Sequence, residues 1–150
     1  MRRLRIAMRD EWGVSVVEFA LVAPVLLLIL VGILDLGRAV NAYVTVSNAA
    51  REGSHYLAVH ATAAPSAIAS AVHERVVLLD PAQVTVTASY FNGSSFQAWP
   101  ASPTSNPSPA YTPVRVTVSY PWSAATFIGM FFPGGSGATF SASSTVDMLR

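Results

Sequence analysis

The longest run of apolar residues lies near the N-terminus of the chain. Between Phe19 and Leu34 no side chain is charged, and Leu, Val and Ile dominate. A helix needs about 20 apolar residues to cross the hydrocarbon core of a bilayer. An ordinary secretory signal has a shorter apolar region that ends at a small-residue cleavage site, and no such site directly follows this run. The pattern therefore predicts a transmembrane helix over residues 14–36, with Pro24 accommodated by a mild kink.

Beyond residue 36, apolar positions recur at steps of three and four, which predicts an amphipathic continuation of the helix. Its expected apolar face consists of Leu36, Val40, Tyr43, Val44 and Ser47 or Ala50. A second, shorter helix is expected to begin with Ser66 as its N-cap and to end at Asp80-Pro81. Its apolar face consists of Ile68, Val72, Val76 and Leu79.

After Pro81 the period changes to strict alternation of apolar and polar residues, which is the pattern of a half-buried strand. Residues 84–90 and 114–120 both show it, and these two strands are expected to pair. A third strand is predicted over residues 138–148, after a turn at residues 133–135. The expected fold class is α+β and pilin-like, with a long N-terminal helix, a second short helix and an antiparallel sheet of about three strands.

Two connections separate the predicted strands. Residues 92–113 are rich in proline and serine and begin with Asn92-Gly93, so they are expected to form an extended, solvated loop. Residues 122–132 are strongly apolar but too short to cross a bilayer, and we expect a buried or interfacial connection there.

Composition supports a membrane protein. Hydrophobic residues make up 52% of the chain and charged residues only 11%, an imbalance that a water-soluble surface of this size does not tolerate. The net charge is +1 and the arginines are scattered except at the start, so no basic face follows a phosphate backbone and no nucleic acid partner is expected. The chain has no cysteine, which excludes disulfides and Cys-based metal sites.

Catalytic and metal-binding patterns are also missing from the sequence. The three histidines, His55, His60 and His73, do not have the spacing of metal ligands. The many serines are not accompanied by a Gly-x-Ser-x-Gly nucleophile elbow or by a base at a defined offset. We therefore expect no enzyme activity, no cofactor, no metal and no small-molecule substrate.

The distribution of arginine predicts the orientation of the chain. Residues 1–13 form a basic leader containing Arg2, Arg3, Arg5 and Arg9, and the positive-inside rule keeps such a segment in the cytoplasm. Residues 37–150 then form an extracytoplasmic domain, and the protein is expected to be a single-pass protein of the cell membrane.

Gly13, Val14 and Glu18 carry the most informative chemistry. A carboxylate just inside an apolar membrane helix costs a few kcal/mol unless it is paired or lies close to the interface. If the chain is cut after Gly13, Val14 becomes a cationic N-terminus near Glu18, and in an assembly the glutamate of one subunit neutralises the amine of its neighbour. Alternatively, Glu18 is an ordinary interfacial carboxylate stabilised by the helix dipole.

These residues resemble the type IV prepilin family and, more fully, the TadE-like proteins of the tight-adherence (Flp) pilus system. The resemblance rests on Gly13, Glu18-Phe19-Ala20-Leu21, Pro24, Asp35-Leu36-Gly37-Arg38 and Ala49-Ala50-Arg51-Glu52-Gly53. The chain departs from the pattern at Ser54-His55, where a small residue and arginine are more usual. The resemblance implies a minor pilin or pseudopilin that is processed by a prepilin peptidase and acts with other pilin or pseudopilin subunits and pilus assembly proteins.

Several readings stay open. The element from Ala49 to Gly53 fits a close-packed helical stretch and a subunit contact equally well. An uncleaved, membrane-anchored extracytoplasmic binding module would share the predicted topology and differ from a pilin only at Gly13. An exported enzyme would require a constellation of acid, base or metal ligands that the sequence does not show.

Overall fold

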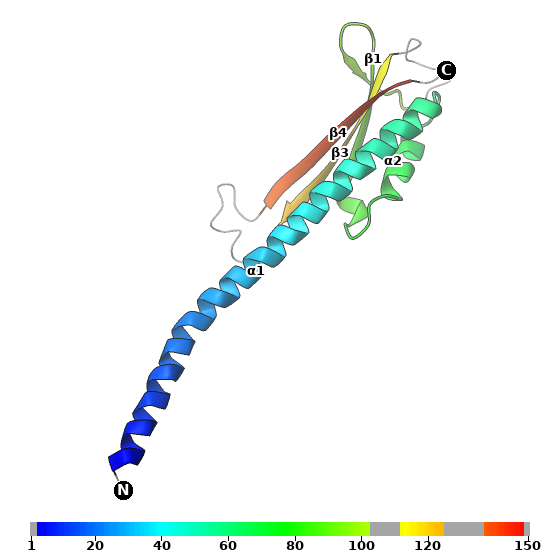
Figure 1. Cartoon of the computed structure of the whole chain (residues 1–150). Helices are drawn as coiled ribbons and strands as arrows, with labels where there is room; N and C mark the ends of the chain where they lie inside the picture. Colours follow the sequence, from blue (N-terminus) through cyan, green and yellow to red (C-terminus); the bar gives the residue numbers. More distant parts are fainter. Residues whose placement is uncertain (1–2, 103–111, 125–136, 149–150) are drawn as a thin grey trace. The chain divides into compact units, whose positions relative to one another are not determined.

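A computed structural model of the chain describes residues 3–102, 112–124 and 137–148, with side chains described from Gly13 onward. The chain forms two compact units, Met1–Gly37 and Arg38–Arg150. The second unit is called the α+β domain below. The elements, labelled in Figure 1, are helices α1 (Arg3–Val59) and α2 (Pro65–His73), the short 3-10 helix η1 (Pro81–Gln83), and strands β1 (Thr85–Phe91), β2 (Phe96–Ala98), β3 (Pro113–Ser123) and β4 (Gly137–Asp147).

The first unit consists of the N-terminal part of α1, and its apolar side chains are open to the surroundings. The large hydrophobic side chains from Val14 to Leu34 are 40% to 72% exposed, apart from Val31, which is half-buried. The most apolar 18-residue window of this helix has a mean hydropathy of 2.8 and contains no buried residue. Pro24 lies inside the helix without ending it. Because so much apolar surface is costly in water, the exposure fits a lipid environment, and α1 is long and apolar enough to cross a membrane.

The α+β domain contains a four-stranded antiparallel sheet in the order β2-β1-β3-β4. The predicted pairing of the first two alternating segments is confirmed, with Val86 opposite Val118 and Ala88 opposite Val116. The predicted third strand is β4, which pairs with β3 along its whole length. The structure adds β2, a strand of three residues, inside the segment predicted to be a loop. Residues 103–111 of that predicted loop lie outside the described residues.

β3 is longer than predicted because Pro121, Trp122 and Ser123 continue to pair with β4. The start of the apolar segment predicted to be a connection is therefore a strand. The remainder of that segment and the predicted turn at residues 133–135 fall within residues 125–136, outside the described residues.

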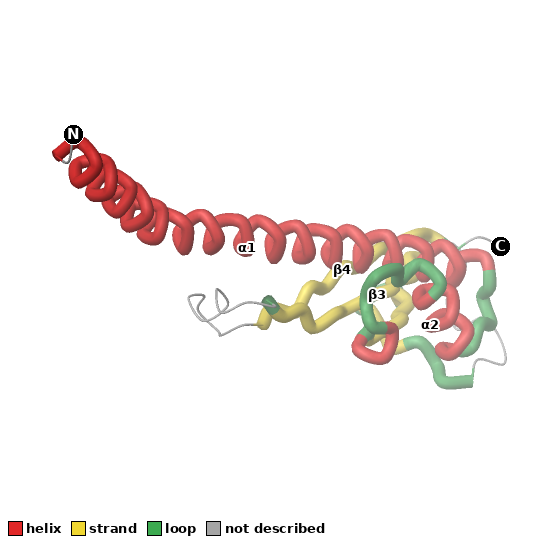
Figure 2. The backbone as a smooth tube through the Cα atoms, turned by 90° about the horizontal axis from the view of Figure 1, so that it is seen from below, coloured by secondary structure: helices red, strands yellow, loops and turns green. Residues whose placement is uncertain are grey.

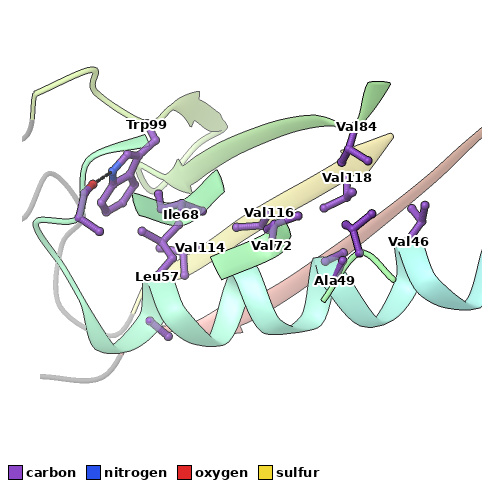
Figure 3. Packing of buried hydrophobic residues seen from close by; sticks show 14 of the residues in the cluster. Val46, Ala49, Leu57, Ile68, Val72, Val84, Trp99, Val114, Val116 and Val118 are labelled. Carbon is purple, nitrogen blue, oxygen red and sulfur yellow. Dashed lines mark hydrogen bonds between the residues drawn. The ribbon is translucent and has the colours of Figure 1, made fainter. Parts of the chain in front are cut away.

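One face of the sheet carries the core, covered by α2 and by the part of α1 that belongs to the α+β domain (Figures 1 and 2). Three valines of β3, Val114, Val116 and Val118, are fully buried against these helices (Figure 3). The buried residues of α1 from Arg38 onward are mostly small: Ala42, Val46, Ala49, Ala50, Gly53, Ser54, Leu57 and Ala58. Small side chains allow the helix to approach the sheet closely.

The predicted continuation of the helix beyond residue 36 is confirmed, but only Ala50 of the residues predicted for its apolar face is buried in the core. Leu36, Val40, Tyr43 and Val44 are 48% to 65% exposed, although the Tyr43 ring also contacts Phe140 edge to face. The buried positions follow the same helical period but lie on another face. The prediction was based on the larger apolar residues, and these lie on a face of the helix that is not buried within the chain.

The start and end of α2 also differ from the prediction. Ala64 is the N-cap and Pro65 takes the first helical turn, where its missing N–H is no loss. Ser66 therefore lies inside the helix, which ends at His73. Ile68 and Val72 form the buried face of this helix, as predicted. Val76 and Leu79, predicted for the same face, lie beyond the end of α2 but also belong to the core or pack against it.

Side-chain hydrogen bonds hold two of the loops around the core in place. The Trp99 indole N–H donates to the Ala63 carbonyl at 2.9 Å, which joins the end of β2 to the loop between the helices (Figure 3). Asn92 Oδ1 accepts from the backbone N–H groups of Ser94 and Ser95, and Gly93 has φ +97. Asn92 therefore organises a tight turn, as its sequence predicts.

Ser54 is a buried polar residue in the face of α1 that meets the sheet. Its Oγ lies 2.9 Å from the Arg51 carbonyl oxygen and 2.8 Å from Ser144 Oγ on β4. Ser54 Oγ is the donor in both contacts, and because a hydroxyl has one hydrogen, it donates to one of these two acceptors at a time.

We expect Ser54→Ala to lower the free energy of unfolding by about 1–2 kcal/mol, since the Ser144 hydroxyl loses its partner. Ser144→Ala should cost less, because Ser54 keeps its bond to the carbonyl. Denaturant unfolding of the two single variants and the double variant measures the effect. Equal losses for the two single variants would show that the Arg51 carbonyl does not serve as an alternative acceptor for Ser54.

Candidate processing and assembly site

The Gly13–Val14 peptide bond lies in the first unit, within α1. Gly13 is exposed, and a Cβ built on it would meet no atom within 4 Å. Val14 is 58% exposed. A glycine inside a helix weakens it by about 0.5–1 kcal/mol relative to alanine. The bond is therefore preceded by a residue without a side chain and lies where the helix is intrinsically easier to open.

Glu18 is exposed one helical turn beyond Val14. Residues four apart in a helix share a face, and their backbones are separated by a rise of about 6 Å. Among the residues whose side chains are described, Glu18 takes part in no ion pair. The exposed carboxylate is thus on the same helix face as Val14.

The next motif residues also lie on the surface of α1. Phe19 is 70% exposed, and Pro24 interrupts the backbone hydrogen bonding of the helix without contributing to the core. Gly37 and Arg38 are exposed, and a Cβ at Gly37 would have no neighbour within 4 Å. Asp35, in contrast, is buried, at 7% exposure. Packing within the described chain therefore does not explain Phe19, Gly37 or Arg38.

The motif from Ala49 to Gly53 has a clear packing role. Ala49, Ala50 and Gly53 are buried, and a Cβ at Gly53 would come within 2.7 Å of Val72 Cγ2 and 2.9 Å of Val116 Cγ1. These small residues let α1 contact α2 and β3 at once. Arg51 points away from the core and is exposed.

Chemistry other than processing finds little support in the described ranges, 3–102, 112–124 and 137–148. They contain no group of three His, Cys, Asp or Glu residues that could hold a metal ion. The three histidines have separate environments: His55 is exposed, His60 stacks on Tyr56 with ring centroids 4.2 Å apart, and the buried Nε2 of His73 has no hydrogen-bond partner.

Sequence reasoning missed one site, a groove on the α+β domain with a volume of about 860 Å³. Its lining comes from α1, from the segment after α2 and from β4: Asn48, Arg51, Glu52, His55, Glu74, Arg75, Val77, Ser144 and Val146. Only Arg51 among them had been singled out as a site residue. Asn48, Glu52 and His55 share the helix face of Arg51 by their spacing, but only the fold brings the segment after α2 and β4 beside them.

The structure defines a class of protein in which one helix long and apolar enough to cross a membrane leads into an α+β domain. The family model described as TadE-like protein matches residues 13–55 of this chain. The match begins at Gly13 and includes all the motif residues discussed above, so it confirms the predicted resemblance to the TadE-like family. This family is pilus-related and structural, and the likeness of this chain to it extends over the matched residues. No curated protein and no solved structure matches the chain.

Proposed function

We propose that this chain is a minor pilin or pseudopilin of TadE-like type. A prepilin peptidase removes residues 1–13, and the mature protein acts in the assembly of a tight-adherence pilus or a related secretion apparatus. The observation that carries the proposal is the family match beginning at Gly13. Gly13 is also where an exposed, unobstructed peptide bond precedes the apolar part of α1.

In this proposal the chain crosses the cell membrane once. The arginine-rich leader stays in the cytoplasm, residues 14–36 form the anchor, and the α+β domain is extracytoplasmic. The partners are the prepilin peptidase, other pilin or pseudopilin subunits, pilus assembly proteins and the membrane.

The peptidase supplies the catalytic groups and this chain supplies the substrate bond. Hydrolysis places a carboxylate on Gly13, which leaves with the leader, and an ammonium group on Val14. A cation is then held at the start of an apolar helix, where its attraction to a carboxylate is stronger than in water. Glu18 of a neighbouring subunit compensates it, and both charges leave water only when subunits are in register.

The mature N-terminus tests this proposal directly. We expect intact-mass and N-terminal analysis of the protein from cells to show a chain that begins at Val14. Gly13→Leu should leave the full-length chain in the membrane, because a bulky side chain then precedes the scissile bond. Gly37→Ala, a matched change at another exposed helical glycine, should be processed normally. A wild-type, assembly-competent protein that begins at Met1 or Arg2 would refute the proposal.

The second candidate is an uncleaved, single-pass membrane protein whose extracytoplasmic domain binds a ligand. The groove on the α+β domain favours it, since a structure with only a packing role does not require such a feature. The two candidates predict different masses for the mature protein, so the same measurement distinguishes them.

A further inference from the structure

The groove on the α+β domain is lined by equal numbers of arginine and glutamate side chains, and only some of them are paired with one another. Its lining contains two arginines and two glutamates. Arg75 Nη2 lies 3.3 Å from Glu52 Oε2, so these two side chains form an ion pair. Arg51 and Glu74 are also exposed at the groove, and neither forms an ion pair within the part of the chain that the structure describes. One positive and one negative group are therefore left for an external partner.

Apolar side chains project beside these charges. Val77, which lines the groove, is 61% exposed, and the adjacent Leu78 is 85% exposed. Leu78 has φ 67, a left-handed conformation that is unfavourable for a bulky residue. The chain thus holds a leucine outward in a strained backbone. Exposed apolar residues beside charged ones are typical of protein contact surfaces.

The charge balance indicates the kind of partner. A strongly acidic or strongly basic partner would meet like charge at half of the groove. A second copy of the same surface offers a glutamate for Arg51 and an arginine for Glu74, and a two-fold contact satisfies both pairs at once. The apolar Val77 and Leu78 of each copy are then covered by the other.

We propose that this groove is a contact surface between the α+β domains of two copies of this chain. Arg51 of one copy pairs with Glu74 of the other, and Glu74 of the first pairs with Arg51 of the second. The contact uses a surface separate from Gly13, Val14 and Glu18, so it does not depend on leader removal. It also gives Arg51 a role that packing of the Ala49–Gly53 motif does not provide.

A charge-exchange experiment on the full chain in detergent micelles tests the proposal. The chain has no cysteine, so a single cysteine introduced at the exposed Thr62 can carry donor and acceptor dyes. Energy transfer between copies then reports their association. We expect Arg51→Glu alone and Glu74→Arg alone to weaken it at least about tenfold, because each variant places like charges opposite one another.

Mixing the two variants should restore association, since a copy with two glutamates then faces a copy with two arginines. Asp147→Arg, a charge reversal at an exposed position outside the groove, should have no effect. The proposal is overturned if the wild-type chain does not associate. The proposal is also overturned if neither charge reversal weakens association, which is the result expected when the apolar helices alone drive association. A failure of the mixed variants to associate would overturn it as well. Cleavage after Gly13 is measured separately, from the mass of the mature protein, so none of these outcomes bears on the proposed function.

Discussion

Replacing Gly53 with leucine is expected to destabilise the α+β domain by about 3 kcal/mol or more, the upper range for overpacking a core. Even a Cβ at this position would approach Val72 Cγ2 to 2.7 Å and Val116 Cγ1 to 2.9 Å. Both neighbours are β-branched and rotate little about χ1, so they cannot move aside without shifting α2 or β3. Leucine is a good helix former, so the loss cannot be attributed to helix propensity.

Chemical denaturation of the full chain in detergent, followed by the tryptophan signal of the domain, measures this effect. Gly37→Leu is the matched control, since a Cβ there meets nothing within 4 Å, and it should leave stability unchanged or slightly higher. Gly53→Ala combined with Val72→Ala should cost less than the sum of the two single changes, because the second creates room for the first. Wild-type stability in Gly53→Leu would show that α1 does not approach the sheet this closely.

Replacing Glu18 with alanine is expected to abolish assembly while leaving membrane insertion intact. The change makes the apolar segment more apolar, so insertion has no reason to fail. The Val14 ammonium created by cleavage loses its compensating carboxylate, and burying an unpaired charge between subunits costs several kcal/mol.

Fractionation of membranes and detection of surface fibres measure the two outcomes separately. Glu18→Gln keeps the size and polarity of the side chain and removes only its charge, so it should also fail to assemble. Val17→Ala changes a neighbouring exposed residue without altering charge and should assemble. Normal fibres in Glu18→Ala would show that the carboxylate has no pairing role and that its position reflects the membrane interface alone.

Strands with a simple repeating pattern could be predicted well from the sequence. The alternation of Val114, Val116 and Val118 with polar residues identifies both the strand and its buried face. β2 could not be found in the same way, because three residues are too short to show a period. Their pairing depends on the turn at Asn92 and on Trp99 reaching the Ala63 carbonyl.

The buried face of α1 shows a different limit. An apolar side chain is expected to be buried in the protein core only when the alternative is exposure to water. Where lipid is the alternative, exposed apolar residues such as Val40 and Val44 carry no such cost, and hydrophobicity does not identify the core face. The core side is selected by size instead, through Ala49, Ala50 and Gly53. These small residues belong to the family motif, but from the sequence alone the motif fitted helix packing and a subunit contact equally well.

The sequence predicted Gly13 as the last residue of the leader and Val14 and Glu18 at the start of the membrane helix, whereas in the structure all three are exposed residues of α1. Their roles in cleavage and assembly remain predictions, because they depend on partners outside this chain. The groove was missed for a topological reason. Arg51 and Glu74 are far apart in sequence, and only the packing of α1 and of the segment after α2 beside β4 brings them together.

The hydrogen bond between Ser54 and Ser144 spans 90 positions of the chain. Proteins are synthesised from the N-terminus, so α1 is made long before the strand that supplies Ser144. Met148, near the end of the chain, is also part of the core. The part of this helix face that the strands cover, Ser54 included, therefore stays uncovered until β3 and β4 have been synthesised, and contacts of such long range make folding slow. Any factor that shields this face during synthesis would act in that interval.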